Sequence, residues 1–71
     1  MASDRPVVVY PPDEDGGRRV RIRGEIFGRA YSLTDVAEFL RRAGVEEAND
    51  VYVRRSGLIE WRGGGFEVWE H

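Results

Sequence analysis

Hydrophobic and polar residues alternate most regularly over residues 19–26. Val20, Ile22 and Ile26 are the apolar positions, and the alternate positions hold Arg19, Arg21, Arg23 and Glu25. An alternation with a period of two is typical of a β-strand with one buried face. The apolar run at residues 7–10 has the composition of a second strand. The two runs therefore predict a pair of strands.

The segment between these runs differs in composition from the rest of the chain. Residues 11–17 read Pro-Pro-Asp-Glu-Asp-Gly-Gly, and these residue types are typical of turns and loops. The whole chain has 71 residues, which is enough for one domain and too few for two. We therefore expect a single domain over residues 1–71, with a flexible loop at residues 11–17 and disorder at residues 1–5.

Between residues 33 and 43 the hydrophobic positions recur with a helical period. They fall at Leu33, Val36, Ala37, Leu40 and Ala43. This spacing places one apolar stripe along a helix. Ser32 is a favourable N-cap, Asp35 complements the helix dipole in the first turn, and Gly44 follows where helices commonly end. The pattern predicts a helix over about residues 33–43.

The remaining sequence predicts three short strands separated by glycine-containing turns. The strands lie at residues 51–54, 58–62 and 66–70, and the turns at residues 55–57 and 63–65. Pairing neighbouring strands through these turns gives one consistently apolar face. That face would carry Val51, Val53, Ile59, Trp61, Phe66 and Val68.

Together these elements predict a small α+β domain with two layers. The expected order is β-β-α-β-β-β, with a mainly antiparallel sheet and the helix at about 33–43 packed on one of its faces. A chain of this length buries a thin core. A homodimer would therefore be a reasonable way to gain stability.

The residue inventory argues against an enzyme and against a metal site. The chain has no cysteine, and its one histidine is His71, so the ligands of a structural zinc site are missing. It also has no lysine, and its few serine and threonine residues suit caps and turns, so no nucleophile can be paired with a base. We expect no catalytic residues, no cofactor, no metal and no small-molecule ligand.

The predicted register leaves one sheet face open to a binding partner. Aromatic and arginine side chains are enriched at interaction hot spots. The candidate partner-binding residues on this face are Tyr52, Leu58, Trp69, Arg21, Arg23 and Arg54. The sequence thus predicts a non-enzymatic binding, adaptor or regulatory domain that acts through macromolecular interaction, with a protein partner or a second copy of the chain.

Nucleic-acid binding is the alternative function, through an arginine-rich β-ribbon that contains Arg19, Arg21 and Arg23. The formal net charge of −2 argues against it, because nucleic-acid-binding domains are usually strongly basic. All 11 basic residues are arginine, which is typical of a high-GC bacterial genome. No apolar run approaches the length of a membrane span and no export signal is visible, so we expect a cytoplasmic protein.

Overall fold

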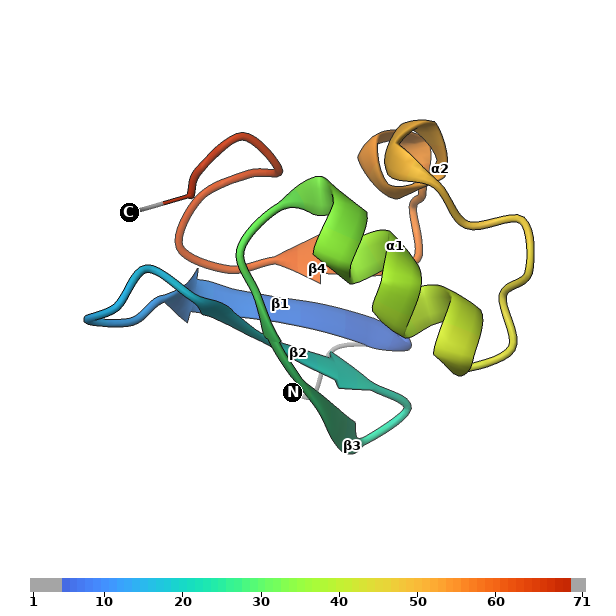
Figure 1. Ribbon diagram of the computed structural model, residues 1–71, viewed down its shortest axis with the longest axis horizontal. Helices are drawn as coiled ribbons and strands as arrows, with labels where there is room; N and C mark the ends of the chain where they lie inside the picture. The colour runs from blue at the N-terminus through green and yellow to red at the C-terminus, as the bar shows by residue number, and fades with distance from the viewer. Residues whose placement is uncertain (1–4, 70–71) are drawn as a thin grey trace.

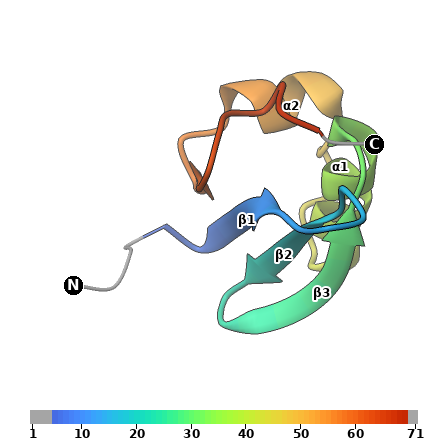
Figure 2. The ribbon, with the colours of Figure 1, turned by 90° about the vertical axis from the view of Figure 1, so that its left-hand side faces the viewer.

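The computed structural model describes residues 5–69 and shows a four-stranded mixed sheet with both helices on one face (Figures 1 and 2). The elements in chain order are β1 (Val7–Pro12), β2 (Arg18–Ile22), β3 (Glu25–Ala30), α1 (Leu33–Arg42), α2 (Asp50–Arg55) and β4 (Ile59–Trp61). The strands lie in the order β3-β2-β1-β4. Strand β1 pairs antiparallel with β2 and parallel with β4. The predicted α+β class is confirmed.

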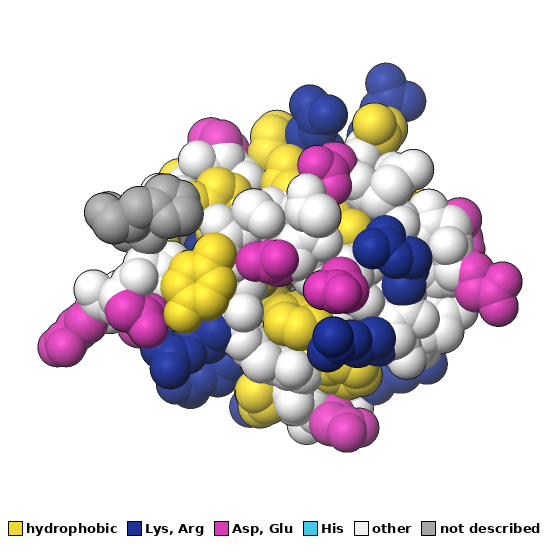
Figure 3. All heavy atoms as spheres, viewed as in Figure 1, with side chains coloured by type: hydrophobic (Ala, Val, Ile, Leu, Met, Phe, Trp, Pro, Cys, Tyr) yellow, Lys and Arg dark blue, Asp and Glu magenta, His cyan; other side chains and the backbone are white. Residues whose placement is uncertain are grey.

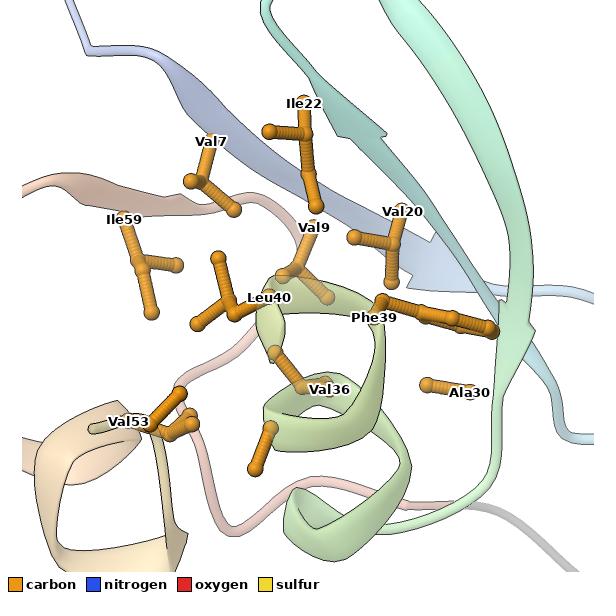
Figure 4. Close-up of a cluster of buried hydrophobic side chains, with 12 residues drawn as sticks. Val7, Val9, Val20, Ile22, Ala30, Val36, Phe39, Leu40, Val53 and Ile59 are labelled. Carbon is orange, nitrogen blue, oxygen red and sulfur yellow. The ribbon is translucent and has the colours of Figure 1, made fainter. Parts of the chain in front are cut away.

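The hydrophobic core lies between the sheet and the helices (Figure 4). Val7 and Val9 of β1 point into it, as do Val20 and Ile22 of β2. The other core residues are Ala30, Val36, Ala37, Phe39, Leu40, Ala48, Val53 and Ile59. Val7 is paired with Ile22 on one side and with Ile59 on the other, so β1 joins both halves of the sheet.

The β1–β2 connection is shorter than the predicted loop. Pro11 and Pro12 belong to β1, and the Asp13 N–H donates to the Gly17 carbonyl at 3.0 Å, which closes a tight turn. Of the segment predicted to be disordered, residues 1–4 lie outside the described residues.

Helix α1 begins and ends where the sequence signals place it. The Ser32 hydroxyl accepts a hydrogen bond from the Asp35 N–H at 3.3 Å, and the Asp35 carboxylate accepts one from the Tyr31 N–H at 2.9 Å. Arg41 and Arg42 occupy the last turn, where positive charge complements the helix dipole. The predicted helix is confirmed to within one residue.

The single strand predicted over residues 19–26 is instead two strands. Strands β2 and β3 are joined at Arg23 and Gly24, whose φ angles are 52° and 83°. A two-residue loop with both residues at positive φ matches the twist of a hairpin. Asparagine and glycine are the usual residues in such a loop, so Arg23 gives no turn signal in the sequence.

Residues 51–54, which were predicted as a strand, belong to helix α2. The Asn49 side chain caps this helix by accepting a hydrogen bond from the Tyr52 N–H at 2.8 Å. Val53 is fully buried, whereas Val51 is 51% exposed. The prediction that both valines share one buried sheet face is wrong, because residues two apart in an α-helix point to nearly opposite sides.

The segment after α2 forms one strand rather than two. Strand β4 confirms the central part of the strand predicted at residues 58–62, but it pairs with β1 instead of with its sequence neighbours. Residues 66–69 form a turn and irregular backbone, and Glu70 lies outside the described residues. The element order is therefore β-β-β-α-α-β and not β-β-α-β-β-β.

Candidate functional site

The six predicted partner-binding residues do not lie together on one sheet face. Tyr52 and Arg54 are on α2, and Leu58 and Trp69 lie before and after β4. Tyr52 and Trp69 also pack against the hydrophobic core, so neither ring is free in the way the sequence predicted. Tyr52 and Arg54 leave the predicted face because residues 50–55 form a helix, and Leu58 and Trp69 leave it because residues 66–69 do not form the predicted strand. Arg21 alone of the six lies on a strand.

Three of the six residues nevertheless meet at a small apolar pocket. Arg23, Tyr52 and Leu58 line it, together with Ser56. The rest of its wall comes from Pro6, Val7, Ile22, Leu40, Ala43, Val45 and Ile59. We call this the Arg23 pocket. Its volume is about 30 Å³, and Leu58 beside it is 50% exposed.

Arg23 holds an unfavourable backbone conformation at this pocket. Within residues 5–69 it is the one non-glycine residue with a positive φ. The left-handed region costs an L-residue with a Cβ roughly 1–2 kcal/mol. Arg23 therefore contributes strain to a turn that glycine would form more easily.

Replacing Arg23 with glycine is expected to stabilise the fold by about 0.5–1 kcal/mol, because relief of the strain exceeds the entropy that glycine adds to the unfolded chain. Urea unfolding would measure the change. Gly24→Ala is the matched control, because its φ is also positive and an added Cβ would meet no atom within 4 Å. It should destabilise the fold by a similar amount. A destabilised Arg23→Gly protein would contradict the assignment of strain.

The helix-free face of the sheet carries a group of arginines. Arg21 is paired with Val8 of β1 and with Ile26 of β3, and Arg19 is paired with Arg29. Val7 and Val9 point into the core, so Val8 points to the side opposite the helices, and its partner Arg21 lies on that side as well. This face thus opposes the one that carries α1, where hydrophobic side chains are interspersed with acidic and basic ones (Figure 3).

Tyr10 organises two of these arginines. The Cζ atoms of Arg21 and Arg62 lie 5.6 and 5.3 Å from the centre of its ring, which is cation–π distance. Arg62 also pairs with Glu60, and that hydrogen bond raises the pKa of Arg62. We call Tyr10, Arg19, Arg21, Arg29 and Arg62 the arginine face.

Arg29, like Arg62, has carboxylate partners, and in its case they come from the β1–β2 turn. Its guanidinium pairs with Asp13 at 3.0 Å and with Asp15 at 2.9 Å, and the hydrogen bond to Asp13 raises the pKa of Arg29. Within the described part of the chain, neither Arg19 nor Arg21 has a carboxylate partner. These two side chains hold the positive charge of the face that is free for another molecule.

Arg18 is not among the predicted site residues, and it is fully buried in the structure. Its Nε donates to the Tyr10 carbonyl at 2.9 Å. Its two Nη atoms donate to the carbonyls of Gly65 and Gly64 at 2.8 Å and of Arg62 and Val68 at 2.9 Å. All five guanidinium N–H groups are therefore used. We call Arg18 with these five carbonyls the Arg18 cage.

Two tryptophan rings complete the cage. The Arg18 Cζ lies 5.3 Å from the ring centres of both Trp61 and Trp69, and the two rings meet edge to face at 88°. Burial lowers the pKa of Arg18, and the charge of Glu67 opposes that shift. The cage thus fixes the segment after β4 to the sheet. A signal for it existed, because Arg18 is in phase with the buried positions 20 and 22 of β2.

The described residues contain no group of three or more acidic, histidine or cysteine side chains that could hold a metal ion. Neither helix within residues 5–69 is long and apolar enough to cross a membrane.

The fold and its surface define a small α+β domain with a mixed four-stranded sheet and a helix-free sheet face that carries arginines. No family model matches the chain, and no curated protein or solved structure matches it either.

Proposed function

We propose that this chain is a non-enzymatic interaction domain that binds a carboxylate-bearing protein surface through its arginine face. The observation that supports this most directly is the pair Arg19 and Arg21, which lie exposed on a helix-free sheet face without a carboxylate partner among the described residues. A guanidinium binds a carboxylate with two parallel, charge-assisted hydrogen bonds.

Tyr10 adds to the case because it restricts the side chain of Arg21. A long arginine side chain loses about 2 kcal/mol of rotamer entropy when it is fixed. Stacking over Tyr10 removes part of that freedom before any partner arrives. Binding therefore gives up less entropy than it would with an unsupported arginine.

A protein partner fits this face better than a nucleic acid does. Asp13, Asp15 and Glu60 pair with Arg29 and Arg62, so Arg19 and Arg21 are the two guanidinium groups of this face that a partner can use. Two guanidinium groups suit one or two carboxylates, whereas a nucleic-acid backbone is usually held by many more cationic contacts. Single-stranded nucleic acids are commonly held by several aromatic rings on which successive bases stack. Among the described residues, the arginines of this face have cation–π contacts with one ring, that of Tyr10, and two guanidinium groups lie over it.

The test compares an Arg19→Ala/Arg21→Ala variant with an Arg54→Ala/Arg55→Ala variant. Both remove two exposed arginines, but the second pair lies on α2, away from the arginine face. Tagged proteins would capture partners from lysate of the source organism, with and without nuclease. We expect a nuclease-resistant protein partner whose recovery falls at least about tenfold with Arg19→Ala/Arg21→Ala, because each charged contact contributes about 1.5–3 kcal/mol. Recovery should be unchanged with Arg54→Ala/Arg55→Ala.

Three other outcomes would contradict the proposed function and point to a different one. Equal loss with both variants would mean that net charge and not this face drives capture. Loss of the captured material on nuclease treatment would favour nucleic-acid binding. A wild-type chain that captures only itself, and that sediments as a dimer unless Arg19 and Arg21 are replaced, would assign the face to self-association.

A further inference from the structure

We propose that the Arg23 pocket binds a short aliphatic carboxylate, with its alkyl end inside the pocket and its carboxylate on the Arg23 guanidinium. This site lies at the end of the sheet marked by the β2–β3 turn and is separate from the arginine face. The proposal does not depend on the function assigned to that face.

The wall of the pocket accounts for the aliphatic part of the ligand. Val7 and Ile22 come from the sheet, Leu40 from α1 and Ile59 from β4, so four elements enclose one apolar space. A volume of about 30 Å³ corresponds to two water-sized groups. The space therefore suits two methyl groups or an ethyl group and is too small for an aromatic ring.

The charge at the pocket accounts for the carboxylate. Among the residues that the structure describes, Arg23 has no ion-pair partner, although it lines a mostly apolar site. Sparsely populated backbone conformations cluster at ligand sites, where a side chain is held in place against its local preference. The positive φ of Arg23 fits this pattern, because glycine would form the turn with less strain. An aliphatic carboxylate would fill the apolar space with its alkyl group and pair its charge with Arg23.

This chemistry has two sources in a cell. One is a free short-chain carboxylic acid. The other is the C-terminal residue of a polypeptide, which carries an aliphatic side chain beside a free carboxylate. Isobutyrate represents the first source, and N-acetylvaline presents the same isopropyl group with the amide of a peptide.

The test is a titration of the ¹⁵N-labelled full chain with isobutyrate, followed by amide chemical shifts. We expect saturable shifts at the pocket residues Val7, Ile22 and Leu40, with a dissociation constant on the order of 1 mM for so small a ligand. Isobutyramide lacks the charge and acetate lacks the isopropyl group. Both should bind at least about tenfold more weakly.

Variants separate a loss of binding from a loss of folding. Arg23→Gly should bind isobutyrate at least about tenfold more weakly while its unfolding midpoint rises, since the turn is relieved. Arg21→Ala, two residues away on the arginine face, should bind as the wild type does. N-acetylvaline that binds more tightly than isobutyrate identifies a polypeptide terminus as the ligand, and the opposite order identifies a free acid. The proposal is overturned if no shift saturates, if isobutyramide binds equally well, or if Arg23→Gly keeps its affinity.

Discussion

Replacing Arg18 with alanine is expected to lower the free energy of unfolding by about 3–5 kcal/mol, as when one partner of a buried charged network is removed. Five backbone carbonyls lose their donor at once, and the two tryptophan rings lose the group between them. A domain of this size has roughly 4–11 kcal/mol of stability in total. Urea unfolding followed by tryptophan fluorescence would measure the change.

Arg18→Lys tests whether the shape of the guanidinium matters beyond its charge. A lysine ammonium has three N–H donors at one point, so it cannot reach five carbonyls spread around the cage. We expect Arg18→Lys to recover less than half of the stability lost by Arg18→Ala. The exposed neighbour Arg19→Ala is the control and should change stability by less than about 0.5 kcal/mol.

Chemical rescue distinguishes the cage from a general loss of packing. Low concentrations of guanidinium should stabilise Arg18→Ala and destabilise the wild type, because the free cation can occupy the vacated carbonyl site. Urea at the same concentration should destabilise both proteins. An Arg18→Ala protein with near wild-type stability would show that water replaces the guanidinium at little cost, and the cage would then not hold the C-terminal segment.

Replacing Trp69 with alanine is expected to destabilise the fold by about 2–4 kcal/mol, somewhat below the usual loss for a fully buried tryptophan. Trp69 is half-buried, contacts Arg18 and Trp61, and donates its Nε1–H to the Phe66 carbonyl at 2.7 Å. Thermal unfolding would measure the loss.

Trp69→Phe is the informative companion variant. It keeps a ring beside Arg18 and removes the Nε1–H donor, so it should cost about half as much as alanine. Removing the apolar side chain of the exposed Leu58 by Leu58→Ala should leave the melting temperature nearly unchanged, because that side chain is 50% exposed. A Trp69→Ala protein with unchanged stability would show that Trp69 does not support the fold and would agree with the sequence-based prediction that it is an exposed partner-binding residue.

The parts of the fold that the sequence predicted are those governed by local rules. Helix α1 has its cap, its apolar stripe and its terminal glycine within a dozen residues, and the structure agrees with all three. Strand β1 contains an apolar run, and β4 alternates as Ile59-Glu60-Trp61 with turn residues nearby. In each case neighbours in the sequence decide the conformation.

The errors arose where contacts distant in sequence override local preference. Residues 51–54 favour a strand by composition, but Asn49 caps a helix there and burial of Val53 against α1 holds it. The Asn49-Asp50 pair was an available signal for that helix. Residues 66–69 alternate like a strand, yet the Val68 carbonyl accepts a hydrogen bond from Arg18 of β2, 50 positions earlier in the chain. The phase of Arg18 along β2 indicates that it is buried, but it does not identify the carbonyls that Arg18 binds.

The sequence predicted which types of residue form the candidate site, but it did not predict which of them lie together. Arginine and aromatic residues do lie on an open sheet face, but the aromatic one is Tyr10 and not Tyr52 or Trp69. The hairpin at Arg23 folds part of the predicted arginine stripe into a turn. That change moves Arg23 from the face to the pocket.

The pairing of β1 with β4 has a consequence for how the protein is made. Strand β1 is synthesised before the other described elements, but one of its two neighbours, β4, is synthesised after them, and the Arg18 cage joins residues 47 and 50 positions apart. A nascent chain on the ribosome can therefore form the β1–β2–β3 hairpins and α1 early but cannot complete the sheet until β4 has emerged. Because its decisive contacts are non-local, folding should be slower than in a helical bundle of the same length. During that interval the edge of β1 that faces β4 is unpaired, and its backbone N–H and C=O groups are open to pairing with other chains.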